Sequence, residues 1–178
     1  MNFLENYRVW CDADLPETAK AELASEEGMA LAYKMMTTLN KSARDAMVKY
    51  NVHACTDVTG FGLLGHTYEM AEGSNVEITL NVDTIDLIPE ALEFARMGIL
   101  PAGMYRNRKF VEPGVDAGDT ELAKQDMLYD PQTAGGLLMA VAPEDADALF
   151  EELKTTVPSA QRIGTVAEYE GGKRIKLR

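Results

Sequence analysis

The chain has 178 residues, of which 46% are apolar and 26% are charged, and its 17 basic and 29 acidic side chains give a formal charge of −12. This composition is typical of a soluble globular protein with one domain or slightly more. Nucleic-acid binding is disfavoured because a phosphate backbone requires clustered Lys and Arg. The modest basic cluster of Arg106, Arg108 and Lys109 is followed by acidic residues. We therefore expect no nucleic-acid partner.

A membrane-bound or secreted protein is also disfavoured. The longest hydrophobic run, Leu137 to Ala142, is six residues long, far short of a bilayer span. Residues 1–10 contain Glu5 and Arg8 and lack the apolar core of a secretory signal. Two cysteines, Cys11 and Cys55, are too few for a disulfide framework. We expect a cytoplasmic protein without a membrane partner.

The first half of the chain predicts two helices, a strand and a further helix. Residues 1–24 have no sustained period and are treated as an atypical N-terminal segment. From Ser25, an expected helix cap, apolar residues recur at helical spacing to about Tyr50, with a break near residues 37–40 after which Asn40 could cap a second piece. A short strand at about 53–58, a glycine-rich turn and a helix that ends at Gly73 and Ser74 follow.

The second half mixes strands and helices. Residues 76–83 alternate between apolar and polar side chains, which predicts a strand with one wet face. A short helix is expected from Pro89 to Met97 and an irregular, functional or mobile loop over 99–135. Leu137 to Ala142 predicts a buried strand, Pro143 begins an amphipathic helix that ends before Pro158, and the tail around Gly171 and Gly172 predicts a β-hairpin. The fold class expected is α+β, a layered mixed sheet flanked by helices.

Three glycines after the first strand form a possible dinucleotide-binding pattern. Gly60, Gly62 and Gly65 spell G-x-G-x-x-G, and Asp83 lies 83 − 62 = 21 residues past the middle glycine. A dinucleotide-binding sheet is covered on both faces, so its strands should be nearly continuous apolar runs. The first strand here is polar and the second alternates. A dinucleotide-binding domain is therefore the less favoured alternative.

Asp57 is the first candidate ligand-binding residue. It ends the predicted strand and precedes Thr59 and a turn whose N–H groups begin a helix, which suits one edge of a Mg²⁺–phosphate group. Mg²⁺ normally takes one or two carboxylates together with waters and phosphate oxygens, so Asp57 alone makes no metal site. The alternative is that Asp57 caps the helix near Phe61 or satisfies the turn, and that Gly60 and Gly62 only give the chain room.

Two further features are open to a functional or a structural interpretation. His66 is a candidate acid or base, although a single His in a helix is more often packed or solvated, and Cys55 is expected to be a small core residue. Residues 129–138 begin with Asp130 and Pro131 in a turn and continue through a glycine pair that allows close backbone approach before a strand. By chemistry alone this segment is a loop entering a strand.

Together, the two glycine segments resemble a known family. Asp57-Val-Thr-Gly-Phe-Gly-Leu-Leu-Gly-His66 and Asp130-Pro-Gln-Thr-Ala-Gly-Gly-Leu-Leu138, with Met36-Thr-Thr-Leu-Asn-Lys41 before them, are similar to the C-terminal domain of the selenophosphate synthetases, or selenide, water dikinases. The likeness runs from about Ser25 to Arg178. It implies a domain over 25–178 of the aminoimidazole ribonucleotide synthetase C-terminal type. It also implies the conversion of ATP, selenide and water to selenophosphate, AMP and phosphate with Mg²⁺.

The resemblance assigns roles to a few residues. The family's Mg²⁺-binding aspartate falls on Asp57, and we expect Thr59, Gly60 and Gly62 to contact the cofactor. Ala134 stands where the family usually has Ser, so any polar role of that position is in doubt. No catalytic residue is carried over to Cys11, because it lacks the family's glycine-rich setting.

The resemblance implies that the family's nucleophile, catalytic Lys, further metal ligands and most ATP contacts belong to an N-terminal domain, and we expect that domain to be missing from this chain. We therefore expect no dikinase activity from the chain alone, and a partner that is a separate N-terminal catalytic domain or subunit, or a second copy in a homodimer. The alternatives are a non-catalytic binding or regulatory domain and a truncated paralogue.

Overall fold

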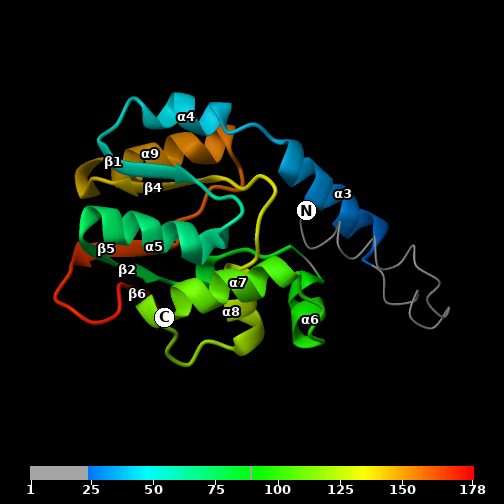
Figure 1. The fold of residues 1–178 in the computed structure, drawn as a ribbon. Coiled ribbons are helices and arrows are strands. Elements are labelled where there is room, and N and C mark those ends of the chain that lie inside the picture. Colours follow the sequence, from blue (N-terminus) through cyan, green and yellow to red (C-terminus); the bar gives the residue numbers. More distant parts are fainter. Residues whose placement is uncertain (1–23, 89) are drawn as a thin grey trace, which may run out of the picture.

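The computed structural model describes residues 24–88 and 90–178. The atypical segment expected over residues 1–24 lies almost wholly outside the described residues, as does Pro89, the expected first residue of a helix. The described part is a layered α+β fold with mixed sheets and helices (Figure 1), which confirms the predicted fold class. No helix in the described part is long and apolar enough to cross a membrane.

The first helical stretch is broken where the sequence predicts. Helix α3 (Glu26–Thr37) begins after Ser25, whose side-chain oxygen accepts from the Gly28 N–H at 3.0 Å. Helix α4 (Lys41–Met47) follows Asn40, but the Asn40 side chain makes no cap hydrogen bond. Instead its amide nitrogen donates to the carbonyl of Gly135 at 3.1 Å. Asn40 therefore ties the start of α4 to the second glycine segment.

The first sheet has two strands. Strand β1 (Val52–Asp57) pairs antiparallel with β4 (Leu137–Val141), and Asp57 lies opposite Leu137. Helix α9 (Pro143–Thr156) packs against α4 on one side of this sheet, and α5 (Gly62–Ser74) lies between it and the second sheet (Figure 1). The strand expected over Leu137 to Ala142 forms, but the residues of β4 are only half-buried, so the prediction of a buried strand is only partly right. The neighbour of β4 in this two-stranded sheet is β1.

The second sheet corrects the predicted C-terminal hairpin. Its order is β3 (Val115–Asp116), β6 (Ile175–Leu177), β2 (Val76–Leu80) and β5 (Gly164–Glu168). Strand β2 lies between the two arms of the expected hairpin, antiparallel to β5 and parallel to β6. The register sets Ile175 beside Ile78 and Leu177 beside Leu80, all buried, so β6 gains more burial beside β2 than it would as an outer hairpin arm.

The predicted irregular loop over residues 99–135 is also wrong. After α6 (Ala91–Arg96), which ends near Gly98 at φ +77°, the chain forms α7 (Ala102–Val111), the 3₁₀ turn Glu112–Gly114, β3 and α8 (Leu122–Leu128). The buried face of α7 carries the polar residue Asn107, and the buried face of α8 carries Asp126. These polar residues interrupt the apolar period that would have predicted the helices.

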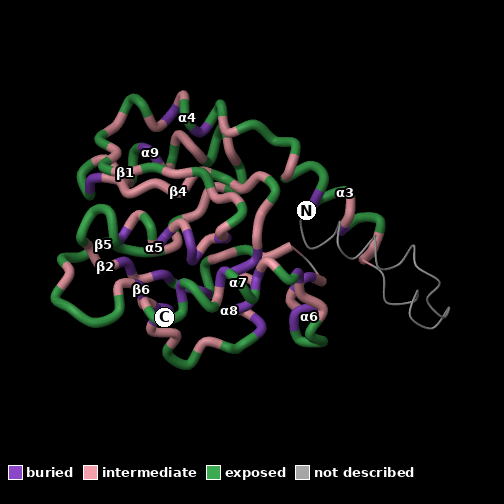
Figure 2. Tube along the Cα trace, viewed as in Figure 1, coloured by how far each residue is buried: buried purple, intermediate pink, exposed green. Residues whose placement is uncertain are grey.

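The main core lies between α5, the second sheet, α7 and α8, where buried segments concentrate (Figure 2). A smaller cluster around Ala32 and Phe94 joins α3 to α6. Strands β1 and β2 belong to different sheets, so Gly60, Gly62 and Gly65 do not stand in the parallel strand–helix–strand unit of a dinucleotide-binding fold.

Candidate functional site

The two glycine segments meet at the end of β1 and form one platform. The Val58 N–H donates to the Gly136 carbonyl at 3.0 Å, and the Gly135 N–H donates to the Val58 carbonyl at 2.8 Å. The Gln132 N–H donates to the Thr59 carbonyl at 3.0 Å. Backbone hydrogen bonds therefore fix residues 58–62 against residues 129–136, although more than 60 residues separate them along the chain.

Gly60 and Gly62 have different surroundings in the turn: backbone atoms crowd Gly62, whereas Gly60 faces open space. Gly62 has φ +72°, and a Cβ there would lie 2.7 Å from the Asp130 carbonyl oxygen, so only glycine fits without a shift. Nothing lies within 4 Å of a Cβ placed on exposed Gly60. Gly62 therefore allows the two segments to pack, whereas Gly60 leaves room for another molecule.

Asn107 of α7 is the residue of the platform that the sequence analysis missed. Its side-chain amide donates to the carbonyls of Gly60, at 2.9 Å, and Tyr129, at 3.0 Å, and the residue is 7% exposed. One side chain thus holds both segments through their backbones. The sequence gives only a weak signal for this role. Asn107 lies three positions after Met104 and four before Val111, a spacing that places it on the same buried helix face as these two apolar residues.

Asp57 ends β1 with its side chain on the exposed side of the strand. Among the described residues, its carboxylate has no hydrogen bond and no ion pair. Helix α5 begins after Phe61 without a side-chain cap, so the alternative in which Asp57 caps this helix is not what the structure shows. The Thr59 carbonyl accepts from the Gly62 N–H at 2.9 Å and closes the turn. Asp57 is thus a free carboxylate at the rim of a rigid turn.

His66 joins this turn through its side chain. Its Nε2 lies 3.2 Å from Thr59 Oγ1, and its Nδ1 lies 3.0 Å from Glu69 Oε2. The imidazole is 12% exposed and meets the ring of Phe61 edge-on at a centroid distance of 5.9 Å. A Cβ at Gly65 would lie 2.6 Å from Phe61 Cβ, so this glycine makes room for the aromatic contact. The histidine is therefore held on three sides.

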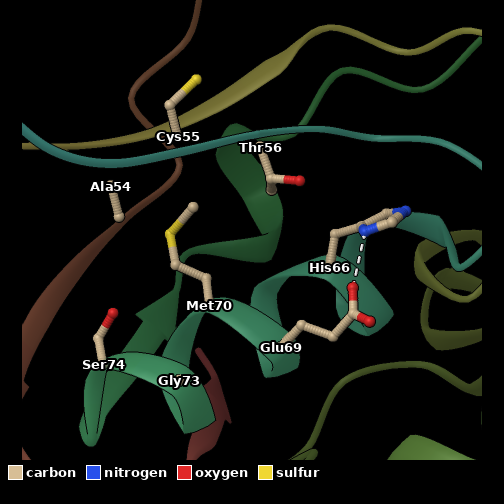
Figure 3. A pocket seen from close by; sticks show the side chains of 8 residues that line it. All are labelled: Ala54, Cys55, Thr56, His66, Glu69, Met70, Gly73 and Ser74. Atoms are coloured by element: carbon tan, nitrogen blue, oxygen red, sulfur yellow. Dashed lines mark hydrogen bonds and ion pairs between the residues drawn. The ribbon is translucent and has the colours of Figure 1, made fainter.

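His66 and Glu69 form one wall of an open hollow of about 270 Å³ between α5 and β1 (Figure 3). Ala54 and Thr56 point from β1 towards this hollow, whereas Cys55 points to the other side of the strand (Figure 3). Cys55 is exposed, so its prediction as a core residue is wrong; alternation along β1 places it outward. Partial burial and the Asp57 charge raise the pKa of the Cys55 thiol, which does not favour a nucleophilic thiolate.

Asp130 is a buried residue of the second glycine segment, at 4% exposure. Its Oδ2 accepts from Gln132 Nε2 at 2.6 Å, and its Oδ1 has no partner among the described residues. Burial raises the pKa of Asp130 to about 7, partly offset by the Gln132 hydrogen bond. The hydrogen bond between the Asp130 and Gln132 side chains thus lies within the second glycine segment and stabilises its conformation.

The described residues contain no group of three or more His, Cys, Asp or Glu side chains placed to hold a metal. A Mg²⁺ ion that arrives with phosphates needs fewer protein ligands, often one or two carboxylates. The free carboxylate of Asp57 at the end of β1, two residues before Thr59 and three before the open Gly60, could serve as one such ligand. The rest of the coordination would come from phosphates, water and other protein ligands.

Comparisons with known proteins agree with one another. The sequence pattern of the family described as AIR synthase related protein, C-terminal domain, matches residues 12–176. A selenide, water dikinase of Treponema denticola is 48% identical over 135 residues, covering 76% of this chain and 38% of the relative. Enzymes of that name from Clostridium botulinum strain Eklund 17B and Caldanaerobacter subterraneus are 40% and 46% identical and are covered over 46% and 44% of their lengths. The chain spans less than half the length of these relatives.

Proposed function

The chain belongs to the AIR synthase related family, whose C-terminal domain it contains, and on this premise we propose that it supplies the C-terminal half of a selenide, water dikinase. The reaction is the conversion of ATP, selenide and water to selenophosphate, AMP and phosphate. The place of action is the cytoplasm.

The free carboxylate of Asp57 on the hydrogen-bonded platform is the observation that carries this proposal. Phosphoryl transfer depends on positioning and on neutralising charge. A Mg²⁺ ion bound with nucleotide phosphates would supply that neutralisation, and Asp57 would hold it on one side. The rigid turn keeps Asp57, Thr59 and Gly60 in a fixed arrangement, and Gly62 acts by allowing the turn to pack.

The chain alone has no dikinase activity in this proposal. One carboxylate and one turn make neither a nucleotide cradle nor a full set of Mg²⁺ ligands. The remaining groups come from an N-terminal catalytic part, as a separate domain or subunit, which carries most of the ATP contacts. A second copy of the chain, in a homodimer, is the other partner in this proposal.

A reconstitution experiment tests this function. The purified chain is mixed with the N-terminal part of the Treponema denticola relative, Mg²⁺–ATP and selenide, and phosphorus NMR follows AMP and selenophosphate. We expect products only in the mixture, and their loss with Asp57→Asn. The matched control, Asp119→Asn, changes an exposed aspartate away from the platform and should keep the activity.

The outcomes separate the proposed function from its alternatives. Activity of the isolated chain would contradict the half-enzyme proposal, and so would equal activity of the Asp57→Asn mixture. A folded chain that gives no product in any mixture but binds the N-terminal part would instead be a non-catalytic binding or regulatory domain.

A further inference from the structure

The side chains of Glu69, His66 and Thr59 form a hydrogen-bonded chain that runs from the surface to the turn after β1 (Figure 3 shows its Glu69–His66 link). Glu69 is at the exposed end, with 52% of its side chain accessible, and His66 is nearly enclosed. The proposed function uses Asp57 and the turn but gives this chain of three side chains no role.

The chemistry of the three groups fixes the direction of the hydrogen bonds. An ionised carboxylate only accepts hydrogen bonds, so Nδ1–H of His66 donates to Glu69. In a neutral imidazole the other nitrogen is then an acceptor. The Thr59 hydroxyl therefore donates its hydrogen bond to Nε2. With its only proton directed at His66, the Thr59 oxygen has lone pairs left but no donor for a further ligand.

From this geometry we infer that the Glu69–His66 pair makes the Thr59 hydroxyl an acceptor-only oxygen, so this position receives a divalent cation or its bound water and not a bare phosphate oxygen. The inference deepens the proposed function and rests on it for the identity of the ligand. His66 is a positioning residue, because it acts through Thr59.

The surroundings support a fixed rather than an adaptable imidazole. Phe61 meets His66 edge-on and stacks on Phe110 at a centroid distance of 5.8 Å, so the imidazole packs against an aromatic pair. Thr59 is held at its carbonyl by the N–H groups of Gly62 and Gln132. Both ends of the Thr59–His66 hydrogen bond are therefore anchored independently of any ligand.

Nitrogen NMR of the two imidazoles tests the hydrogen-bond direction in the full chain without any ligand. At about pH 8.5, where a histidine ring is normally neutral, we expect His66 to carry its proton on Nδ1 and Glu69→Ala to shift it towards Nε2. Glu72→Ala, an exposed glutamate one turn later, is the matched control and should leave His66 unchanged. Thr59→Val should perturb the Nε2 signal and Thr59→Ser should restore it. A proton on Nε2, or a doubly protonated ring, in the unmodified chain would overturn the inference.

Ligand titration tests the second half of the inference with the metal and phosphate as separate probes. The titration uses the chain mixed with the N-terminal part of the Treponema denticola relative, because the proposed function takes most nucleotide contacts from that part. In this mixture, signals of Thr59 should broaden with Mn²⁺ and ADP together and should not respond to inorganic phosphate alone. Loss of the hydroxyl in Thr59→Val should weaken Mn²⁺ binding in the presence of ADP about tenfold, the equivalent of one charge-assisted hydrogen bond or ligand, and Thr59→Ser should recover it.

A response of Thr59 to phosphate alone would overturn the assignment. If the His66 proton is on Nδ1 but Mn²⁺ with ADP leaves every residue of the turn unaffected, the ligand assignment and the proposed function both fail while the hydrogen-bond direction stands.

Discussion

The backbone N–H of Gln132 donates to the carbonyl of Thr59 across 3.0 Å and so joins the second glycine segment to the turn after β1. This bond requires close approach of two backbones, and the approach is closest at Gly62, where a Cβ would lie 2.7 Å from the Asp130 carbonyl oxygen. The platform that positions Asp57 thus depends on the absence of a side chain at Gly62.

Replacement of Gly62 should therefore destabilise the fold, whereas replacement of Gly60 should not. Gly62→Ala adds a Cβ at φ +72° against a backbone carbonyl, and we expect a loss of about 2 kcal/mol or more in the free energy of unfolding, measured by urea denaturation. Gly60→Ala is the matched control, since open space surrounds its Cβ, and its effect should stay within about 0.5 kcal/mol. Equal losses for the two variants would show that close approach at Gly62 is not what matters.

Removal of the Asn107 side chain should loosen both segments at once. Asn107→Ala leaves the carbonyls of Gly60 and Tyr129 without their buried donor, and we expect a loss of about 1–3 kcal/mol. Asn107→Asp should cost more near neutral pH, because a carboxylate would face two carbonyl oxygens. Asn51→Ala, at an exposed position, should change stability by no more than about 0.5 kcal/mol. A tolerant response at position 107 would count against its bridging role.

The elements that the sequence predicted well are those whose buried faces are apolar. Helix α9 and the alternating strand β2 follow the expected periods, and Ser25 begins α3 as predicted. Helices α7 and α8 were missed because Asn107 and Asp126 occupy inward positions. The predicted hairpin was wrong for a different reason. Strand β6 pairs with β2, about a hundred residues earlier, and with β3, about sixty residues earlier, and local turn signals carry no information on such pairings.

The candidate site was predictable only in part. The strand–turn–helix pattern placed Asp57 and Thr59 at a strand end, and the structure agrees on their location. Asn107 donates to carbonyls that are 47 and 22 residues away along the chain. Because every residue has a backbone carbonyl, no pattern of side chains in the sequence indicates which carbonyls Asn107 binds. The hydrogen bonds of His66 with Thr59 and Glu69 depend on the actual side-chain geometry, because Thr59 lies before α5 and outside its period.

The buried carboxyl of Asp130 should make stability depend on pH. Its pKa is raised from 3.8 to about 7 in the folded state, so the folded protein binds this proton more tightly than the unfolded chain. Stability should therefore fall as pH rises from about 4 to about 7 and then level off, with a contribution on the order of 4 kcal/mol at most. Asp130→Asn keeps an acceptor for Gln132 and removes the ionisation.

We accordingly expect Asp130→Asn to exceed the unmodified chain in stability at about pH 8 by 1 kcal/mol or more, and to differ little at about pH 4. Urea denaturation at both pH values measures this difference, and Asp119→Asn at an exposed site serves as the control. Parallel pH profiles for the unmodified chain and Asp130→Asn would mean that Asp130 ionises in the folded state without penalty.

The ion pair of Arg108 and Asp126 should be strongly coupled, because it joins α7 to α8 and is largely buried. The Arg108 guanidinium binds Asp126 and lies 5.6 Å from the centre of the Tyr129 ring, and the Asp126 side chain is 8% exposed. Burial raises the pKa of Asp126, and the charge of Arg108 opposes that rise. Arg108→Met should therefore leave a buried carboxylate without its cation and cost about 3 kcal/mol near neutral pH.

A double-mutant cycle decides whether the two residues act together. Asp126→Asn in the Arg108→Met background removes the uncompensated charge and should recover part of the lost stability, so the combined loss should be smaller than the sum of the single losses. Arg96→Met is the matched control, since Arg96 pairs with Glu121 and Glu93 at the exposed surface, and its loss should not exceed about 1 kcal/mol. The loss in Arg108→Met should also shrink as pH falls and Asp126 takes up a proton. Strictly additive losses, independent of pH, would show that Arg108 stabilises α7 by packing on Tyr129 and not by balancing the charge of Asp126.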